Sequence, residues 1–175
     1  DALAEAPLPR RARPGDLRCL AGDRWGRTGA AIRAHYEGRS LEGFPKIREA
    51  AFYPLPRLEL LALSGLLRGS LDSSDGLAET LWQLSELGVR VELEVLPLYP
   101  DVLAFAGSEE AALELVLYGG EEFEAVLVVP QEGAAAVEAR AKAKGLPLFR
   151  VGRVVAGEGV YLRGAPLPRK GYAHF

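Results

Sequence analysis

The sequence lacks two residue types altogether, methionine and asparagine, and it contains a single cysteine, Cys19. One cysteine excludes an internal disulfide and a cysteine-based zinc site. Because methionine is absent and the chain starts at Asp1, we expect a natural segment upstream of these 175 residues. A shortage of amide side chains is typical of proteins from thermophiles, and a GC-rich coding sequence produces the same bias.

Neither sign of charge dominates, since 21 Lys and Arg residues stand against 24 Asp and Glu residues and leave a net charge of −3. Such a balance gives no general attraction to nucleic acid or to an anionic membrane. The sequence also lacks an uncharged run long enough to span a bilayer, and it does not open with a basic and then apolar signal segment. We therefore expect no nucleic-acid partner and no membrane partner. The hydrophobic content of 49% and the length suit one globular domain.

Hydrophobic periodicity predicts helices that alternate with strands along most of the chain. The expected strands are residues 17–21, 89–95, 123–129, 148–155 and 160–162, and the expected helices are residues 28–36, 58–69, 77–87, 108–117 and 132–144. Residues 70–76 are polar and predict a turn. In residues 89–95 apolar and charged side chains alternate, which indicates a strand with one solvated face. This order predicts an α/β fold, more closely an α+β sandwich with helices packed on a mixed sheet.

The densest polar cluster is the turn at residues 72–77, Asp-Ser-Ser-Asp-Gly-Leu, which opens the predicted helix at 77–87. Unpaired N–H groups at a helix start attract anions such as phosphate. Asp72 and Asp75 would repel a phosphate directly, but two carboxylates hold Mg²⁺, which in turn binds phosphate oxygens. Ser and Asp before a helix are also the usual N-caps. From residue types alone, helix capping is the commoner role and a metal–nucleotide site is the alternative.

A second candidate is the stretch 117–123, Leu-Tyr-Gly-Gly-Glu-Glu-Phe, between a predicted helix and a predicted strand. Paired glycines allow either a tight turn or a close approach of the backbone to a ligand. Glu121 then lies at the entrance of the strand, where its carboxylate suits a cationic group. The alternative is a helix stop followed by a solvated residue.

The C-terminal stretch 170–175, Lys-Gly-Tyr-Ala-His-Phe, is unusually aromatic for a chain end. Its Tyr172 and Phe175 either pack back onto the domain or cover a flat ligand. The two histidines, at positions 35 and 174, lack the spacing of metal ligands, and Cys19 lies in an apolar run that is typical of a small buried residue. The sequence contains no phosphate-binding glycine-rich fingerprint and no Gly-x-Ser-x-Gly motif.

Taken in this order, the motifs resemble thiamine-monophosphate kinase, a family of the aminoimidazole ribonucleotide synthetase-like superfamily. Residues 72–77 match its Asp-Ile-Ser-Asp-Gly-Leu turn, and residues 119–124 match its Gly-Gly-Glu-Asp-Tyr-Glu stretch. The tail at 170–175 matches its Lys-Gly-aromatic-x-His-Phe ending. Residues 56–57, Pro-Arg, and 152–153, Gly-Arg, match two further steps, so the resemblance covers nearly the whole chain.

The resemblance implies ATP-dependent phosphorylation of thiamine monophosphate to thiamine diphosphate, with several Mg²⁺ ions and with ATP as co-substrate. It implies that Asp72 and Asp75 coordinate metal and that Ser74 contacts the nucleotide. It further implies that Glu121 and Tyr172 contact the substrate, because a carboxylate and an aromatic ring suit a cationic heteroaromatic ligand.

Members of that family begin with an N-terminal ATP-binding domain that forms the homodimer, and nothing in these residues matches it. We therefore expect residues 1–16 to be a linker from that missing domain. Residues 17–175 are expected to be a substrate-binding domain that folds like the C-terminal domain of aminoimidazole ribonucleotide synthetase. The complete protein is expected to be a cytoplasmic homodimer, and this chain alone to be inactive. Two alternatives are another ATP-dependent synthetase of the superfamily and a non-catalytic binding module.

Overall fold

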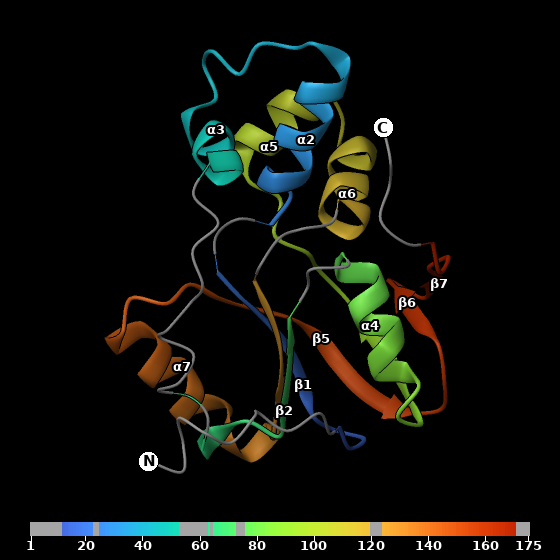
Figure 1. The fold of residues 1–175 in the computed structure, drawn as a ribbon. Coiled ribbons are helices and arrows are strands. Elements are labelled where there is room, and N and C mark those ends of the chain that lie inside the picture. The colour runs from blue at the N-terminus through green and yellow to red at the C-terminus, as the bar shows by residue number, and fades with distance from the viewer. Residues whose placement is uncertain are drawn as a thin grey trace.

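The computed structural model describes residues 12–22, 25–52, 63, 65–72, 76–119 and 124–170, and Figure 1 shows how the elements are arranged. The elements in these ranges are, in chain order, β1 Leu17–Ala21, α2 Arg27–Glu37, α3 Pro45–Phe52, β2 Gly69–Asp72, α4 Leu77–Ser85, β3 Val89–Leu93, α5 Pro100–Ala106, α6 Glu109–Tyr118, β4 Ala125–Val129, a 3₁₀ turn Gln131–Gly133, α7 Ala134–Ala143, β5 Leu148–Ala156, β6 Val160–Leu162 and β7 Ala165–Pro166. No helix in the described part of the chain is long and apolar enough to cross a membrane.

The strands form one seven-stranded sheet in the order β2-β4-β1-β5-β3-β6-β7. β3 and β6 pair in parallel while the other neighbouring strands pair antiparallel, so the sheet is mixed, as predicted. β4 lies inside the sheet between β2 and β1, and all five of its residues are buried. A strand that is covered on both faces needs no polar side, which explains why Ala125–Val129 is a continuous apolar run.

Alternate residues of β4 belong to two different hydrophobic clusters, because successive side chains of a strand point to opposite faces. Val126 and Val128 lie in one cluster with α4 and α6. Leu127 lies in the other cluster, with α7. A third cluster joins α2, α3, α5 and α6 around Phe105, beyond one end of the sheet (Figure 1). The sheet is therefore covered by helices on both faces, which confirms the predicted sandwich.

Most of the predicted elements are confirmed, and local signals explain several of their ends. Ser108 caps α6, since its side chain accepts a hydrogen bond from the backbone N–H of Ala111 at 3.1 Å. Gly38 ends α2 in the left-handed conformation, with a φ of 67°. β3 alternates buried and half-buried residues, as the pattern at 89–95 predicted. Half of the helix predicted at 58–69 falls outside the described residues, and its described end is wrong, because residues 67 and 68 are not helical and Gly69 begins β2.

The turn predicted at residues 70–76 is wrong in its first half, because Gly69–Asp72 forms strand β2. The polar composition favoured a turn, but pairing with Val126 and Val128 of β4 satisfies the backbone of this segment. The sequence patterns also gave no sign of α5 and β7. α5 has only seven residues, and β7 is a two-residue strand that the turn at residues 163–164, where both φ angles are positive, joins to β6.

Cys19 lies in β1 with 3% of its surface exposed, which confirms the expectation of a small buried residue. Burial raises the pKa of its thiol from 9.0 to about 11. Because the thiolate is the reactive form, the folded chain should react with a thiol reagent at pH 8 at least ~100-fold more slowly than the denatured chain. A labelling time course with and without denaturant measures the two rates. Equal rates would contradict the burial of Cys19.

Leu81 is fully buried between α4 and the sheet. Leu81→Ala should lower the free energy of unfolding by about 2–5 kcal/mol, because the surrounding residues cannot fill the cavity. Leu87 is the matched control, since it follows α4 in the chain and is 49% exposed. Leu87→Ala should change the free energy of unfolding by no more than about 0.5 kcal/mol. Urea denaturation measures both, and equal losses would contradict this placement of Leu81.

Candidate functional site

The predicted site residues belong to turns whose neighbouring residues the structure places. Asp72 is the last residue of β2 and pairs with β4 through its backbone. Ser74, Asp75, Glu121 and Tyr172 lie outside the described residues, so their roles stay predictions. The residues that flank them nevertheless show where each turn leaves the sheet and where it returns.

Three turns leave the sheet at one edge. Ala125, the first residue of β4, pairs with Asp72 of β2 on one side and with Ala21 of β1 on the other. Neighbouring strands lie about 5 Å apart, so these three positions fall within about 10 Å of one another. The turn after Ala21, the turn after Asp72 and the turn before Ala125 therefore begin or end side by side. We call this the turn edge of the sheet, defined by Ala21, Asp72 and Ala125; in Figure 1 it faces α6 and the start of α4.

α4 begins directly after the turn that follows Asp72. Its N-cap is Gly76, with φ 95° and ψ 152°, a conformation that favours glycine. The Thr80 backbone N–H and its hydroxyl both donate to the Gly76 carbonyl oxygen, at 3.1 and 2.8 Å. Simple capping would require a Ser or Asp at the N-cap position. Gly76 occupies that position and has no side chain that could cap the helix. The first N–H groups of α4 thus follow a segment that has an aspartate at each end, at positions 72 and 75.

The end of α6 is held against α2 by a contact between two glycines. A Cβ added to Gly119 would lie 2.8 Å from the Cα of Gly29, and one added to Gly29 would lie 3.0 Å from the Cα of Gly119. Gly119 has an ordinary φ of −69°, so glycine is required here because a Cβ would collide with the Leu115 carbonyl oxygen of α6 and with Gly29 of α2, and not because of backbone strain. The sequence suggested a tight turn or a close approach to a ligand at this glycine pair. For Gly119 the close approach is to α2, and it fixes where the turn 120–123 begins.

Sequence reasoning missed a buried carboxylate at the turn edge. Glu124 immediately precedes β4 and has 1% of its surface exposed. Its carboxylate occupies the space that a Cβ on Gly22 would need, and Gly22 has a φ of 109°, which favours glycine. Gly22 and Glu124 therefore fit together as a pair that joins the end of β1 to the start of β4. Only a sequence signal for strand pairing could have shown this contact, because the two residues are 102 positions apart.

Asp16 and Gly152 have structural roles. Asp16 is buried at the opposite end of β1, where its carboxylate accepts from Arg68 Nε at 2.6 Å and from the Arg13 N–H at 2.9 Å. Gly152 pairs with Leu93 in the sheet, and a Cβ at this position would overlap the Glu92 carbonyl oxygen. The Gly-Arg step at 152–153 is therefore explained by close packing of β5 on β3.

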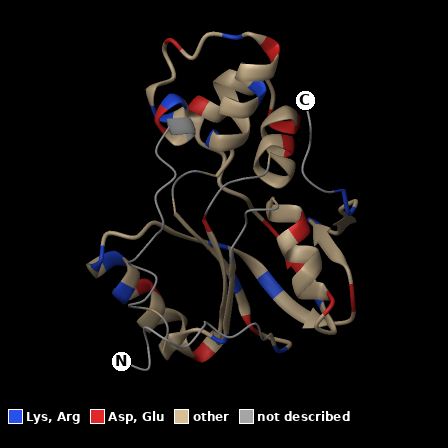
Figure 2. Ribbon diagram, in the orientation of Figure 1, with Lys and Arg blue, Asp and Glu red and all other residues tan. Residues whose placement is uncertain are grey.

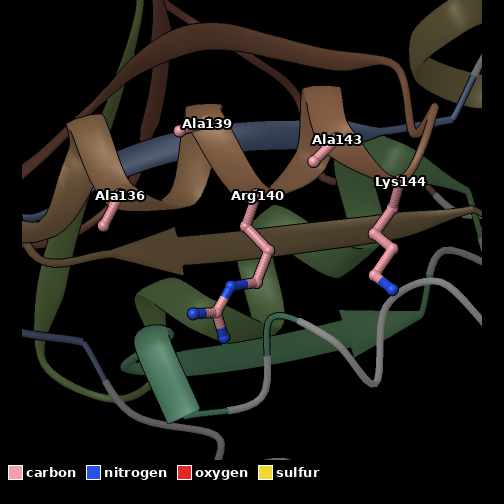
Figure 3. A pocket seen from close by; sticks show the side chains of 5 residues that line it. All are labelled: Ala136, Ala139, Arg140, Ala143 and Lys144. Atoms are coloured by element: carbon pink, nitrogen blue, oxygen red, sulfur yellow. The ribbon is translucent and has the colours of Figure 1, made fainter.

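The described residues contain no group of three or more His, Cys, Asp or Glu side chains that could hold a metal ion. They do include a surface hollow of about 600 Å³ on α7 (Figure 3), lined by Ala136, Ala139, Arg140, Ala143 and Lys144. α7 packs on the face of the sheet opposite to α4 and α6. The lining of the hollow within the described ranges includes no carboxylate, and the hollow lies on the face of the sheet away from α4 and α6.

Gly119→Ala should lower the free energy of unfolding by about 1–3 kcal/mol, because the added methyl group collides with the Leu115 carbonyl oxygen and with Gly29 of α2. Gly133 is the control, since it has a φ of −98° and nothing lies within 4 Å of an added Cβ. Gly133→Ala should leave stability unchanged or raise it by up to about 1 kcal/mol. Thermal unfolding of both variants tests this, and an unchanged Gly119→Ala chain would contradict the helix contact.

Residues 14–165 match the family described as AIR synthase related protein, C-terminal domain. The chain is 31% identical over 156 residues to a thiamine-monophosphate kinase of Pyrococcus horikoshii, an alignment that covers 87% of this chain and 46% of the relative. The crystal structure of tt0281 from Thermus thermophilus is 94% identical with a TM-score of 0.92, and the match covers 94% of this chain and 54% of that one. The crystal structure of thiamine-monophosphate kinase from Stenotrophomonas maltophilia is 27% identical with a TM-score of 0.83, over 91% of this chain and 54% of that one.

These comparisons confirm the resemblance that the motifs predicted. The chain spans about half the length of the curated relatives it matches. The family match extends over most of the chain, from just before β1 to the start of β7. The chain therefore belongs to the family of AIR synthase related proteins and comprises their C-terminal domain.

Proposed function

We propose that this chain is the substrate-binding half of an enzyme that uses ATP to phosphorylate thiamine monophosphate to thiamine diphosphate. The observation that carries the proposal is the pairing of Ala125 with both Asp72 and Ala21, which gathers the motif turns at one edge of the sheet. The relatives named thiamine-monophosphate kinase support this choice of reaction. The upstream half of the protein would supply the remaining ATP contacts and the homodimer contact.

The turn after β2 has the donors that Mg²⁺ prefers. Asp72 and Asp75 offer hard carboxylate oxygens, and Mg²⁺ usually takes one or two protein carboxylates while water and phosphate complete its octahedron. β2 holds Asp72 at the turn edge, and α4 begins at the same turn with first N–H groups that have no partner within the helix and that favour phosphate. These residues therefore fit Mg²⁺ together with a nucleotide phosphate. When bound, Mg²⁺ supplies charge neutralisation between the two anionic reactants.

The remaining predicted residues would orient the reactants. Ser74 belongs to the same turn as the aspartates and would donate its hydroxyl to the nucleotide. Glu121 precedes β4 and would place a carboxylate beside the cationic ring of the substrate, while Tyr172 would stack on that ring. Two anions must meet in line for a direct phosphoryl transfer, so positioning and neutralisation account for most of the catalysis and proton transfer for little.

ADP release from ATP, Mg²⁺ and thiamine monophosphate tests the proposal, measured on this chain and on the full-length protein. We expect turnover by the full-length protein and little or none by this chain alone. A panel with aminoimidazole precursors and selenide identifies another synthetase of the superfamily. The full-length protein would be a non-catalytic module if it showed no Mg²⁺-dependent binding of nucleotide or thiamine monophosphate. Equal activity of the two forms would contradict the need for a second half.

Asp75→Asn in the full-length protein should lower kcat by about 100-fold or more, because it removes a carboxylate that neutralises the transferred charge. Folding should be unaffected, since the change is nearly isosteric. Glu158→Gln is the control: it removes one carboxylate from the exposed connection between β5 and β6, at the end of β5 away from the turn edge. Steady-state kinetics and thermal unfolding measure both variants. Full activity of Asp75→Asn would exclude its metal role.

A further inference from the structure

After β7, residues 167–170 cross the outer surface of α4 and α6, and we call them the C-terminal strap. The Leu167 N–H donates to the Val160 carbonyl oxygen at 2.9 Å, and the Leu167 side chain packs against the core between α4, α6 and the sheet. The Tyr118 hydroxyl at the end of α6 donates to the Pro168 carbonyl oxygen at 2.9 Å. Two hydrogen bonds to its backbone and the packing of Leu167 therefore hold the strap, in addition to the contacts of its two charged residues.

Arg169 binds a row of side chains on α4. Its guanidinium donates twice to the carboxylate of Glu79, from Nη2 at 2.8 Å and from Nε at 3.2 Å, and it also donates from Nη1 to Glu86. The guanidinium carbon lies 5.9 Å from the centre of the ring of Trp82, a residue that lies between Glu79 and Glu86 in the sequence. A two-point guanidinium–carboxylate contact fixes orientation as well as distance. Arg169 thus holds the strap along α4 in one register.

Lys170 makes the corresponding contact with α6. Its Nζ lies 3.2 Å from both carboxylate oxygens of Glu114 and 4.4 Å from the centre of the Tyr118 ring. Figure 2 shows acidic residues on α4 and α6 and basic residues in the chain that returns from β7. Two cations therefore face three carboxylates and two aromatic rings across the strap.

The strap ends next to both motif turns. Glu79 lies in the first turn of α4, just after the turn that carries Asp75, and Tyr118 is the last residue of α6, just before the turn that carries Glu121. Tyr172 follows Lys170 by two residues, a distance of at most about 7 Å along the chain. The contacts of Arg169 and Lys170 thus hold the last described residues of the chain on α4 and α6, beside both motif turns.

We propose that Arg169 and Lys170 are positioning residues, which fix the C-terminal strap on α4 and α6 so that Tyr172 reaches the substrate at the turn edge. This inference rests on the proposed function. A single exposed ion pair contributes little, so the strap depends on several contacts that act together. The hydrogen bonds from Arg169 hold the pKa of the Glu79 carboxyl below its ordinary value, which is consistent with a contact that persists at neutral pH.

The test compares Arg169→Ala, Arg169→Lys and Arg150→Ala in the full-length protein. Arg150 is the matched control, because its ion pair with Glu138 at 2.8 Å is also exposed but lies on the face of the sheet that α7 covers. We expect Arg169→Ala to raise the KM for thiamine monophosphate by about threefold to tenfold and to leave the KM for ATP within about twofold. Arg169→Lys should recover part of the loss, and Arg150→Ala should behave like the wild type.

Hydrogen exchange of the backbone amides of Leu167, Arg169 and Lys170 reports in parallel whether the strap has been released. An unchanged KM for thiamine monophosphate in an Arg169→Ala protein whose strap exchanges faster would overturn the positioning role. So would an equal rise of KM in Arg150→Ala, or a rise that is the same for both substrates. A wild-type protein with no thiamine-monophosphate kinase activity would instead overturn the proposed function, and this inference with it.

Discussion

Ala125 pairs with Asp72 on one side and with Ala21 on the other, and the candidate site depends on this register. The segments that meet here are far apart in sequence, and only the antiparallel pairing of β4 with β1 and β2 brings their turns together. A slip of one residue would exchange the side chains of β4 between the two hydrophobic clusters and disrupt the close packing of both. Because β4 is buried on both faces, that slip is strongly disfavoured. The hydrophobic core therefore determines where the polar turns lie.

The helices also fix the positions of the turns at this edge. α6 ends against α2 at the contact of Gly119 with Gly29, and α4 begins at Gly76 at the same edge. The buried carboxylate of Glu124 fills the space left by Gly22. A polar group therefore packs between the end of β1 and the start of β4 at the turn edge. The C-terminal strap lies outside the same two helices. Each turn that carries a predicted ligand residue is thus held at one or both ends by packed structure.

The sequence predicts the parts of the fold whose signals are local. β3 shows strict alternation, α6 has its Ser108 cap, and α2 has its Gly38 stop, and the structure confirms all three. β2 was misread because its polar residues favour a turn in isolation, while its stability comes from pairing with β4. α5 was missed because a helix of seven residues that begins at Pro100 has too short an apolar pattern to detect.

For the site, the motifs predict which residues bind metal, nucleotide and substrate. They also predict that Asp72 lies just before the turn that opens α4. They do not predict the contact of Glu124 with Gly22 or the contacts of Arg169 on α4, because both depend on residues distant in sequence. For the tail, the two alternatives for Tyr172 and Phe175 concern residues outside the described part of the chain, and no residue pattern revealed the contact of Lys170 with α6. The predicted roles of Tyr172 and Glu121 rest on the resemblance and on the placement of their neighbours.

The central claim is that one edge of the sheet gathers the metal-binding and substrate-binding turns. Paramagnetic broadening by Mn²⁺ in place of Mg²⁺ tests it directly, because carboxylate sites take both ions and the broadening falls steeply with distance. In the full-length protein, the amide signals of Gly22, Gly76 and Ala125 should broaden first. Those of Gly69 and Val129, about 10–14 Å away at the other ends of β2 and β4, should broaden later. Broadening that begins at Gly69 and Val129, or that affects all five amides equally, would contradict the account.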